Sequence, residues 1–217
     1  MRVHRLRSYP ARMERISRAP PRAMSTSLGL LAVLFWASTG AFSRVAVEAV
    51  GYFTTAAILY LAAGLLSCAW AAARGRFTGM LRQPRRYLIA CGALFVLYTL
   101  CFYGAITLAA DRQVAIEVAL ENYLWPALVL VLSVPLLGNA WSWLLLPGAG
   151  IALAGTLLAS ADAHGLSAGA FVRHVSANGL AFAGGLVAAI SWGLYSNLSR
   201  RWGRPDLPGG VPLFLLA

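Results

Sequence analysis

The sequence predicts an all-α integral membrane protein with six spanning helices and the beginning of a seventh. Three observations favour this fold. Hydrophobic residues make up 59% of the chain and charged residues only 12%, about half the charge of a soluble domain. Uncharged runs long enough to cross a bilayer follow one another along the chain. A faint internal repeat relates two of the apolar segments.

The repeat pairs residues 29–44, GLLAVLFWASTGAFSR, with residues 185–200, GLVAAISWGLYSNLSR. Six of the sixteen positions are identical at an offset of 156 residues. Membrane helices repeated at such an offset are typical of transporters built from two related halves. The offset predicts that a second half would run to roughly residue 316. We therefore expect the 217 residues to contain only the start of that half.

The spans follow the uncharged runs 49–73, 87–110 and 122–161. We divide the longest run at Leu137-Gly138-Asn139, a turn sequence. The spans are helices because open strands would leave backbone groups unpaired in hydrocarbon. The predicted spans are 28–47, 53–73, 87–109, 115–137, 141–160 and 179–199, and a seventh begins near Gly209.

These spans predict four parts: an Arg-rich tail (1–23), a first five-helix repeat (24–160), a periplasmic loop (161–178) and the start of a second repeat (179–217). The tail has no apolar core or cleavage site, so it is not a signal peptide. It is either a cytoplasmic arm or the result of a mis-assigned start, because Met24-Ser-Thr-Ser directly precedes the first span.

All 18 basic residues are arginines, and their placement predicts the orientation. Fifteen lie in the tail, in the loop 74–86 and after residue 199. These segments lie on one side of the membrane if the chain crosses it at each predicted span. The other side has only Arg44, Arg112 and Arg173. Positive loops stay cytoplasmic, which places the N-terminus inside. Nucleic-acid binding is not expected, because no folded basic module with interleaved aromatic residues accompanies the tail.

The chain has no recognisable catalytic or metal-binding pattern. Cys68, Cys91 and Cys101 fall inside predicted spans and are interpreted as packing residues. The histidines, His4, His164 and His174, lie outside the spans, and there is no HExxH or P-loop. We therefore predict no enzyme activity, no metal and no cofactor.

The densest polar cluster is Asp111–Pro126, DRQVAIEVALENYLWP, where the fourth span begins. Glu117, Glu121 and Trp125 are spaced i, i+4, i+8 and so share one face of a continuous helix. Asn122 lies beside that face. Pro126 lacks a backbone donor and is expected to bend the helix, which exposes carbonyl groups where a substrate can bind.

Two interpretations of the carboxylates remain open. Carboxylates within a membrane usually face a cavity or a partner, which favours a role in proton or charge coupling. Alternatively, Glu117 stands in the first turn of the span, near water and favoured by the helix dipole. Glu121 lies one turn deeper, so we predict that Glu121, more than Glu117, faces the interior of the bundle.

Aromatic side chains recur at a similar depth in the spans. Trp36 and Trp192 occupy equivalent positions of the repeat, and Tyr98 and Tyr195 lie in the third and sixth spans. Such residues either pack the core or form the wall of a site. Aromatic walls with a few polar groups suit a flat apolar ligand with a polar head.

The segments AIEV and NYLWP, followed by a short span that opens with WxxLPG, resemble the aromatic amino acid exporters of the drug/metabolite transporter (EamA-like) superfamily. The resemblance covers residues 24 to 200. It implies a fold of ten helices in two inverted repeats, with both termini in the cytoplasm of a bacterium. It also implies export of aromatic amino acids across the inner membrane, through a cavity that uses Trp125 and Trp192. Helices seven to ten, which the family uses to complete the cavity, are largely missing from the 217 residues, and Glu121 stands where an apolar residue is expected.

The sequence thus predicts a secondary transporter that exports aromatic or other hydrophobic amino acids by alternating access and is incomplete as given. The alternatives are an efflux protein for other small organic solutes and a non-functional membrane fragment or scaffold. The predicted partners are the lipid bilayer and an aromatic amino acid. The candidate substrate-binding residues are Trp36, Tyr98, Asn122, Trp125, Trp192 and Tyr195, and those for proton or charge coupling are Glu117 and Glu121.

Overall fold

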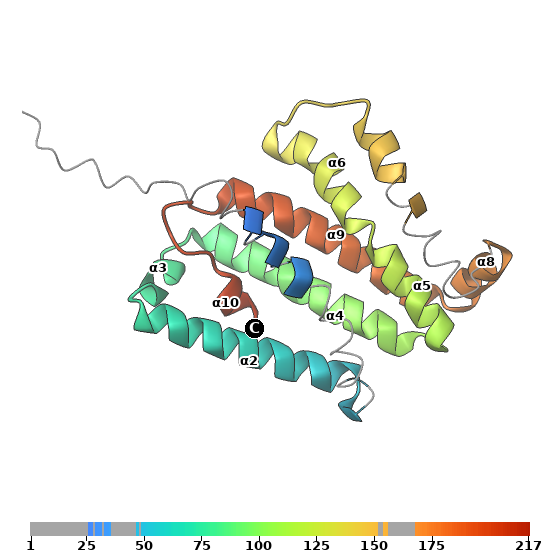
Figure 1. Cartoon of the computed structure of the whole chain (residues 1–217), viewed down its shortest axis with the longest axis horizontal. Helices are drawn as coiled ribbons and strands as arrows, with labels where there is room; N and C mark the ends of the chain where they lie inside the picture. The colour runs from blue at the N-terminus through green and yellow to red at the C-terminus, as the bar shows by residue number, and fades with distance from the viewer. Residues whose placement is uncertain are drawn as a thin grey trace, which may run out of the picture. The chain divides into compact units, whose positions relative to one another are not determined.

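A computed structural model describes residues 26–27, 29–31, 33–35, 47, 49–151, 154–155 and 168–217 (Figure 1). The chain divides into two compact units, 1–49 and 50–217, and all elements below belong to the second. Its elements are α2 (Tyr52–Ala73), α3 (Phe77–Leu81), the π-helical turn η1 (Tyr87–Cys91), α4 (Gly92–Leu108), α5 (Arg112–Asn122), α6 (Trp125–Leu137), α8 (Ala168–Ala177), α9 (Gly179–Trp202) and α10 (Val211–Phe214).

Four described segments are long and apolar enough to cross a membrane. They agree within a few residues with the second, third, fourth and sixth predicted spans. The predicted spans 28–47 and 141–160 lie partly outside the described residues. The seventh predicted span corresponds to α10, which has four residues. The four segments are Tyr52–Ala73, Tyr87–Leu108, Arg112–Leu137 and Gly179–Trp202.

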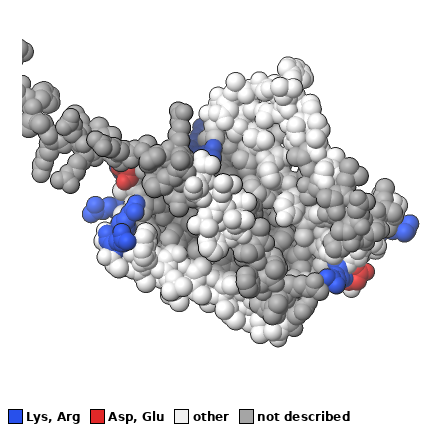
Figure 2. All heavy atoms as spheres, viewed as in Figure 1, with Lys and Arg blue, Asp and Glu red and all other residues white. Residues whose placement is uncertain are grey.

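The outward surface of these helices is apolar. Leu66, Ile89 and Leu180 are each more than 70% exposed, which is unusual for large apolar side chains on a water-soluble surface. On the face shown in Figure 2, the charged side chains lie near two opposite ends, and the described surface between them is uncharged. This distribution fits helices that cross a lipid bilayer.

Helix α9 packs against α4, α5 and α6 (Figure 1). Its buried residues are mostly small and include Ala181, Gly185 and Ala189. Small side chains allow the backbones of neighbouring helices to approach closely. A Cβ atom built on Gly184 would lie 3.3 Å from the Cys101 carbonyl oxygen of α4, so the close approach of α4 and α9 depends on this glycine.

The fourth predicted span is two helices rather than one bent helix. Helix α5 begins at Asp111, whose carboxylate accepts a hydrogen bond from the Val114 N–H over 2.9 Å, as an N-cap residue does. It ends at Asn122, and α6 starts at Trp125 with Pro126 in its first turn. The break has a simple cause: Pro126 cannot donate to the carbonyl four residues earlier, that of Asn122.

Helix α6 ends where the predicted turn begins. Gly138 adopts a left-handed backbone with φ of 72°, and its N–H bonds to the Val134 carbonyl over 3.1 Å. Glycine tolerates this conformation because it has no Cβ atom, and it is the common residue at helix C-termini. The helix therefore ends at the predicted turn Leu137-Gly138-Asn139.

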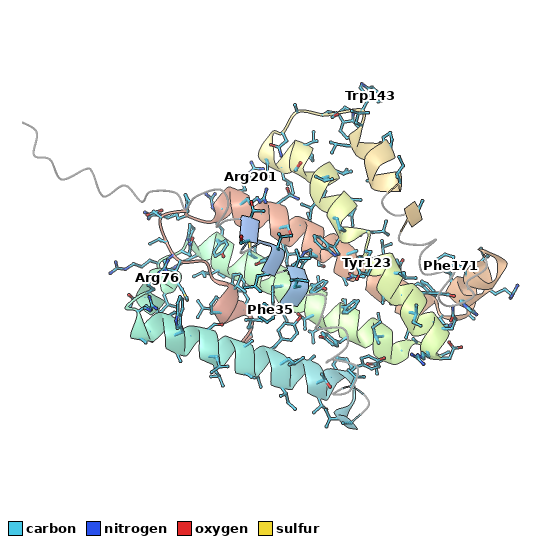
Figure 3. The ribbon with its side chains drawn as sticks, viewed as in Figure 1. Phe35, Arg76, Tyr123, Trp143, Phe171 and Arg201 are labelled. Carbon is cyan, nitrogen blue, oxygen red and sulfur yellow. The ribbon has the colours of Figure 1, made fainter. Side chains whose placement is uncertain are left out.

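The two Arg-rich connections that follow α2 and α9 meet at one end of the unit. The buried side chain of Gln83 donates to the carbonyls of Arg204 and Pro208, each over 3.1 Å, and accepts from the Arg204 N–H over 2.8 Å. Figure 3 shows Arg76 and Arg201 toward this end. The connections with many arginines therefore share one end, as the alternating charge pattern predicted.

The region predicted as the loop 161–178 contains a helix. In the described part, residues 168–177 form α8. Its Phe171 ring packs edge-on against Phe182 of α9, with ring centroids 5.5 Å apart (Figure 3). Helix α8 was not predicted because its ten residues are too few to span a bilayer.

Candidate functional site

The rings of four aromatic residues from three helices surround the ring of Trp192 on α9. Tyr98 and Phe95 extend from α4, with ring centroids 4.7 and 6.0 Å from that of Trp192. Tyr195 lies one turn further along α9 at 5.2 Å, and Trp125 of α6 lies at 6.2 Å in an edge-on arrangement. Aromatic pairs at these separations stabilise one another by about 1 kcal/mol beyond the burial of their surface.

Small and polar residues of α9 bring the two tryptophans together. Gly193, next to Trp192, faces α6, where an added Cβ atom would lie 3.0 Å from the Leu128 Cβ. Asn197 is 1% exposed and donates to the Val129 carbonyl of α6 over 3.0 Å. This close contact places the first turn of α6, and with it Trp125, beside Trp192.

The break between α5 and α6 places Asn122 at the edge of this cluster. Asn122 is 7% exposed, and its side chain interacts with that of Tyr98. Its Oδ1 atom has no hydrogen-bond partner among the described residues. The next two residues, Tyr123 (labelled in Figure 3) and Leu124, end α5, and each of their N–H groups donates to the carbonyl three residues earlier over 3.0 Å. An acceptor is therefore buried next to the aromatic rings without a donor from the described chain.

Glu121 is the second acceptor of this kind. Its Oε2 atom is buried without a hydrogen-bond partner in the described part of the chain. The atom lies against α9, 2.8 Å from where a Cβ atom would stand on Gly185. The carboxylate reaches this position because residue 185 has no side chain.

The prediction that Glu121 faces the interior more than Glu117 is wrong. Glu117 is 2% exposed, whereas Glu121 is only half-buried. The Nδ1 atom of His174 lies 2.8 and 2.9 Å from the two carboxylate oxygens of Glu117. Depth along the helix was a poor guide, because α8 folds over the start of α5 and covers Glu117.

The predicted site residues therefore fall into three groups. Tyr98, Trp125, Trp192 and Tyr195 form one cluster, with Asn122 at its edge. Trp125 does so without the predicted shared face with Glu117 and Glu121, because α5 ends before it. The two carboxylates lie apart from this cluster, Glu117 paired with His174 and Glu121 against Gly185 of α9. Trp36 lies outside the described residues.

Sequence reasoning missed Phe95 and His174. Phe95 lies one turn before Tyr98 in the same span, a spacing that places both on one helix face. His174 precedes the sixth span in a segment with apolar residues at helical spacing, which was the available signal for α8.

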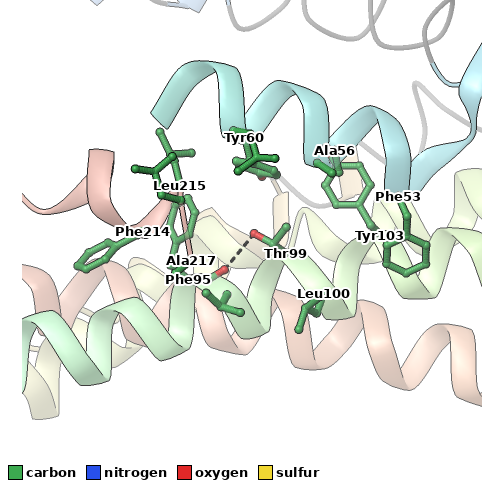
Figure 4. Close-up of a pocket in the computed structure, with 14 residues that line it drawn as sticks. Phe53, Ala56, Tyr60, Phe95, Thr99, Leu100, Tyr103, Phe214, Leu215 and Ala217 are labelled. Atoms are coloured by element: carbon green, nitrogen blue, oxygen red, sulfur yellow. Dashed lines mark hydrogen bonds between the residues drawn. The ribbon is translucent and has the colours of Figure 1, made fainter. Parts of the chain in front are cut away.

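A cavity of about 300 Å³ lies on the other side of Phe95, between α2, α4 and the chain end after α10 (Figure 4). Its polar groups are the hydroxyls of Tyr60, Thr99 and Tyr103, of which Tyr60 interacts with the other two. Phe95 separates this cavity from Trp192, since it contacts Tyr60 on one side and Trp192 on the other, each with ring centroids 6.0 Å apart. None of the described residues that line the cavity has a charged side chain.

Comparison with known proteins assigns the family. Residues 24–161 match the model of the EamA-like transporter family. The chain belongs to the EamA-like transporter family. This confirms the resemblance drawn from the NYLWP segment, and the family is one of transporters rather than enzymes.

The chain is also similar to curated relatives named aromatic amino acid exporter YddG. It is 32% identical to the protein of Salmonella typhimurium over 88% of this chain and 64% of the relative. The Escherichia coli K12 protein is 28% identical over 90% of this chain and 64% of the relative. The Ancylobacter novellus protein is 33% identical over 84% of this chain and 60% of the relative. The chain thus spans less than two thirds of the length of these relatives. No solved structure matches the chain significantly.

Proposed function

We propose that this EamA-like protein exports aromatic or other hydrophobic amino acids across a bacterial inner membrane by alternating access. The observation that carries the proposal is the cluster of rings around Trp192. The rings come from α4, α6 and α9, and in the predicted two-repeat arrangement α9 belongs to a different repeat from α4 and α6. Relative motion of the repeats would then alter the cluster and its exposure to either side of the membrane.

The rings are suited to a flat apolar side chain. Trp192, Tyr98 and Trp125 are partly exposed rather than buried, so ring surface remains available to a ligand. A bound aromatic side chain would gain contacts similar to those between the rings, each contributing about 1 kcal/mol beyond the burial of its surface.

The two unpartnered acceptors support a polar head that donates hydrogen bonds. The Glu121 Oε2 and Asn122 Oδ1 atoms lie on successive residues at the end of α5. An ammonium group offers three N–H donors and a positive charge, which offsets the cost of burying acceptors without partners. We therefore propose that Glu121 and Asn122 hold the ammonium group of an amino acid.

We also propose the orientation with the N-terminus in the cytoplasm. Most arginines of the described unit lie in the connections 74–86 and 200–204, which Gln83 joins at one end. The end that holds the start of α5 and α8 would face the periplasm.

Counterflow into liposomes that contain the full-length protein, including any residues beyond 217, tests the proposed substrate. Trp192→Ala is expected to weaken the apparent affinity for tryptophan and phenylalanine by at least about fivefold, since a wall of the ring site is lost. The matched control is Trp143→Ala, because Trp143 is 83% exposed.

Two outcomes would contradict the proposal. Equal affinities for phenylalanine in the wild type and in a normally inserted Trp192→Ala variant would show that the ring cluster does not bind the substrate. Equal transport of phenylalanine and of 3-phenylpropionate, which has no ammonium group, would favour efflux of other small organic solutes instead.

A further inference from the structure

The contact between Glu117 and His174 lies outside the aromatic cluster and has no part in the transport site proposed above. Glu117 is in the second turn of α5, and its side chain is only 1% exposed. His174 belongs to the last turn of α8, and 28% of its side chain is exposed. One partner of the pair therefore reaches the surface, and the other is enclosed by the helices.

The geometry defines which proton the pair holds. An ionised carboxylate only accepts hydrogen bonds. The His174 Nδ1 atom, at 2.8 and 2.9 Å from the two oxygens, must therefore carry hydrogen whenever Glu117 is ionised. A second proton, on the partly exposed ring, makes the imidazole positive and turns the hydrogen bond into an ion pair. Histidine side chains as a class gain this proton between about pH 5 and 8.

None of the other ionisable groups that the structure describes on the neighbouring helices takes the place of His174 beside Glu117. On α5 and its cap they are Asp111 and Arg112, which are exposed, and Glu121, whose Oε2 atom lies against Gly185. Helix α8 adds Arg173, which is also exposed. The first four turns of α9 have no ionisable side chain before Tyr195, and those of α4 are Tyr98, Cys101 and Tyr103, none of which is a cation. Among the described residues, His174 is thus the cationic partner available to the buried carboxylate.

We propose that Glu117 and His174 form a proton-binding site that holds α8 against the bundle when the proton is bound. A buried carboxylate is costly without a positive partner. When the imidazole loses its charge at alkaline pH, the contact between α8 and α5 weakens. The other contacts of α8, such as that of Phe171 with Phe182, do not depend on pH. The site therefore makes the covering of this end of the bundle sensitive to the pH on the side that α8 faces.

Cysteine labelling of the full-length protein in membrane vesicles tests the site. Val175 of α8 is half-buried against the cluster that contains Val114 and Phe182, whereas Ser176 is exposed. Val175→Cys reports the lifting of α8, and Ser176→Cys corrects for the reactivity of the thiol at each pH. A charged, membrane-impermeant thiosulfonate reagent and peptide mass spectrometry measure labelling at each position separately from the native cysteines.

The ratio of labelling at position 175 to that at position 176 is expected to rise at least about threefold between about pH 6 and about pH 8.5. His174→Gln keeps a hydrogen-bond donor but cannot be charged, so it should remove the dependence on pH, as should Glu117→Gln. A ratio in the wild-type background that does not change with pH overturns the proposal, whether or not the variants insert. The same dependence in His174→Gln also overturns it.

The labelling requires no transport activity, so its outcome is independent of the proposed export function. If amino acids are exported, the rate should depend on the pH on the side of α8 in the wild type and not in His174→Gln. A dependence on pH in labelling without amino acid transport would leave the proton site standing and contradict the proposed function alone.

Discussion

Asn197 of α9 donates a hydrogen bond to the backbone carbonyl of Val129 on α6, over a distance of 3.0 Å. The same Nδ2 group bonds to the Gly193 carbonyl one turn earlier in α9, at 2.9 Å. This amide connects the two helices that carry Trp192 and Trp125. The geometry of the candidate site therefore depends on a residue that does not belong to the aromatic cluster.

Asn197→Ala removes both hydrogen bonds and leaves a small void, because Asn197 is 1% exposed. We expect the free energy of unfolding to fall by about 1–3 kcal/mol, the usual effect of losing a buried hydrogen-bonding side chain. Thermal unfolding in detergent measures the change. Asn139→Ala is the control, since Asn139 is exposed in the turn after α6 and should unfold like the wild type. Equal midpoints for both variants would show that the amide does not hold α6 against α9.

Gly185→Ala is expected to disturb the position of Glu121. The added Cβ atom would lie 2.8 Å from the Glu121 Oε2 atom and 3.1 Å from the Val118 Cγ1 atom, so the Glu121 carboxylate has to leave its position and Val118 has to shift. Such overpacking typically costs about 1–3 kcal/mol. Gly179→Ala, at the start of the same helix, adds a Cβ atom with nothing within 4 Å and serves as the control. Unfolding midpoints of the two variants that differ little would contradict the close contact of Glu121 with α9.

Gln83→Leu keeps the size of the side chain and removes its hydrogen bonds to residues 204 and 208. The connection between α9 and α10 is then expected to open more often, which exposes the peptide bond before Asp206 to an endoprotease that cleaves on the N-terminal side of aspartate. Limited proteolysis should show cleavage there at least about fivefold faster, because several hydrogen bonds of about 1 kcal/mol each are lost. Gln113→Leu on α5, where no such contact exists with this connection, should leave the rate unchanged. Cleavage at the wild-type rate in Gln83→Leu would mean that other contacts, such as the bond from the Gly210 N–H to the Tyr87 hydroxyl at 2.9 Å, hold the connection alone.

Labelling of introduced cysteines tests the proposed orientation. Arg82→Cys in the connection after α3 should react only from the cytoplasmic side, and Ser176→Cys on α8 only from the periplasmic side. Both residues are exposed, and the arginine count places the first of them inside. Intact cells treated with an impermeant reagent provide one side, and inverted vesicles the other. Reaction of both positions from the same side would exclude this orientation.

The sequence by itself determined the class of the protein, the family and four of the spans. These follow from composition and from runs of uncharged residues, because a bilayer imposes the same length and polarity on every segment that crosses it. The turn at Gly138 and the break before Pro126 are also local, since a left-handed backbone or a missing N–H acts within one turn of a helix. The aromatic set Tyr98, Trp125 and Trp192 was predicted because these residues recur at a similar depth in the membrane. Spans that cross the same bilayer lie side by side, so residues at one depth can come close together.

Only the tertiary structure decided which carboxylate is buried and what lies beside it. Glu117 and Glu121 differ by one helical turn, and no property of α5 alone distinguishes their surroundings. Two contacts decide these surroundings: α8 packs over Glu117, and Gly185, opposite Glu121, has no side chain. Likewise, Phe95 and Asn197 owe their roles to the neighbours that α4 and α6 present. Burial and pairing depend on segments far apart in the chain, and the periodicity of one helix holds no information about them.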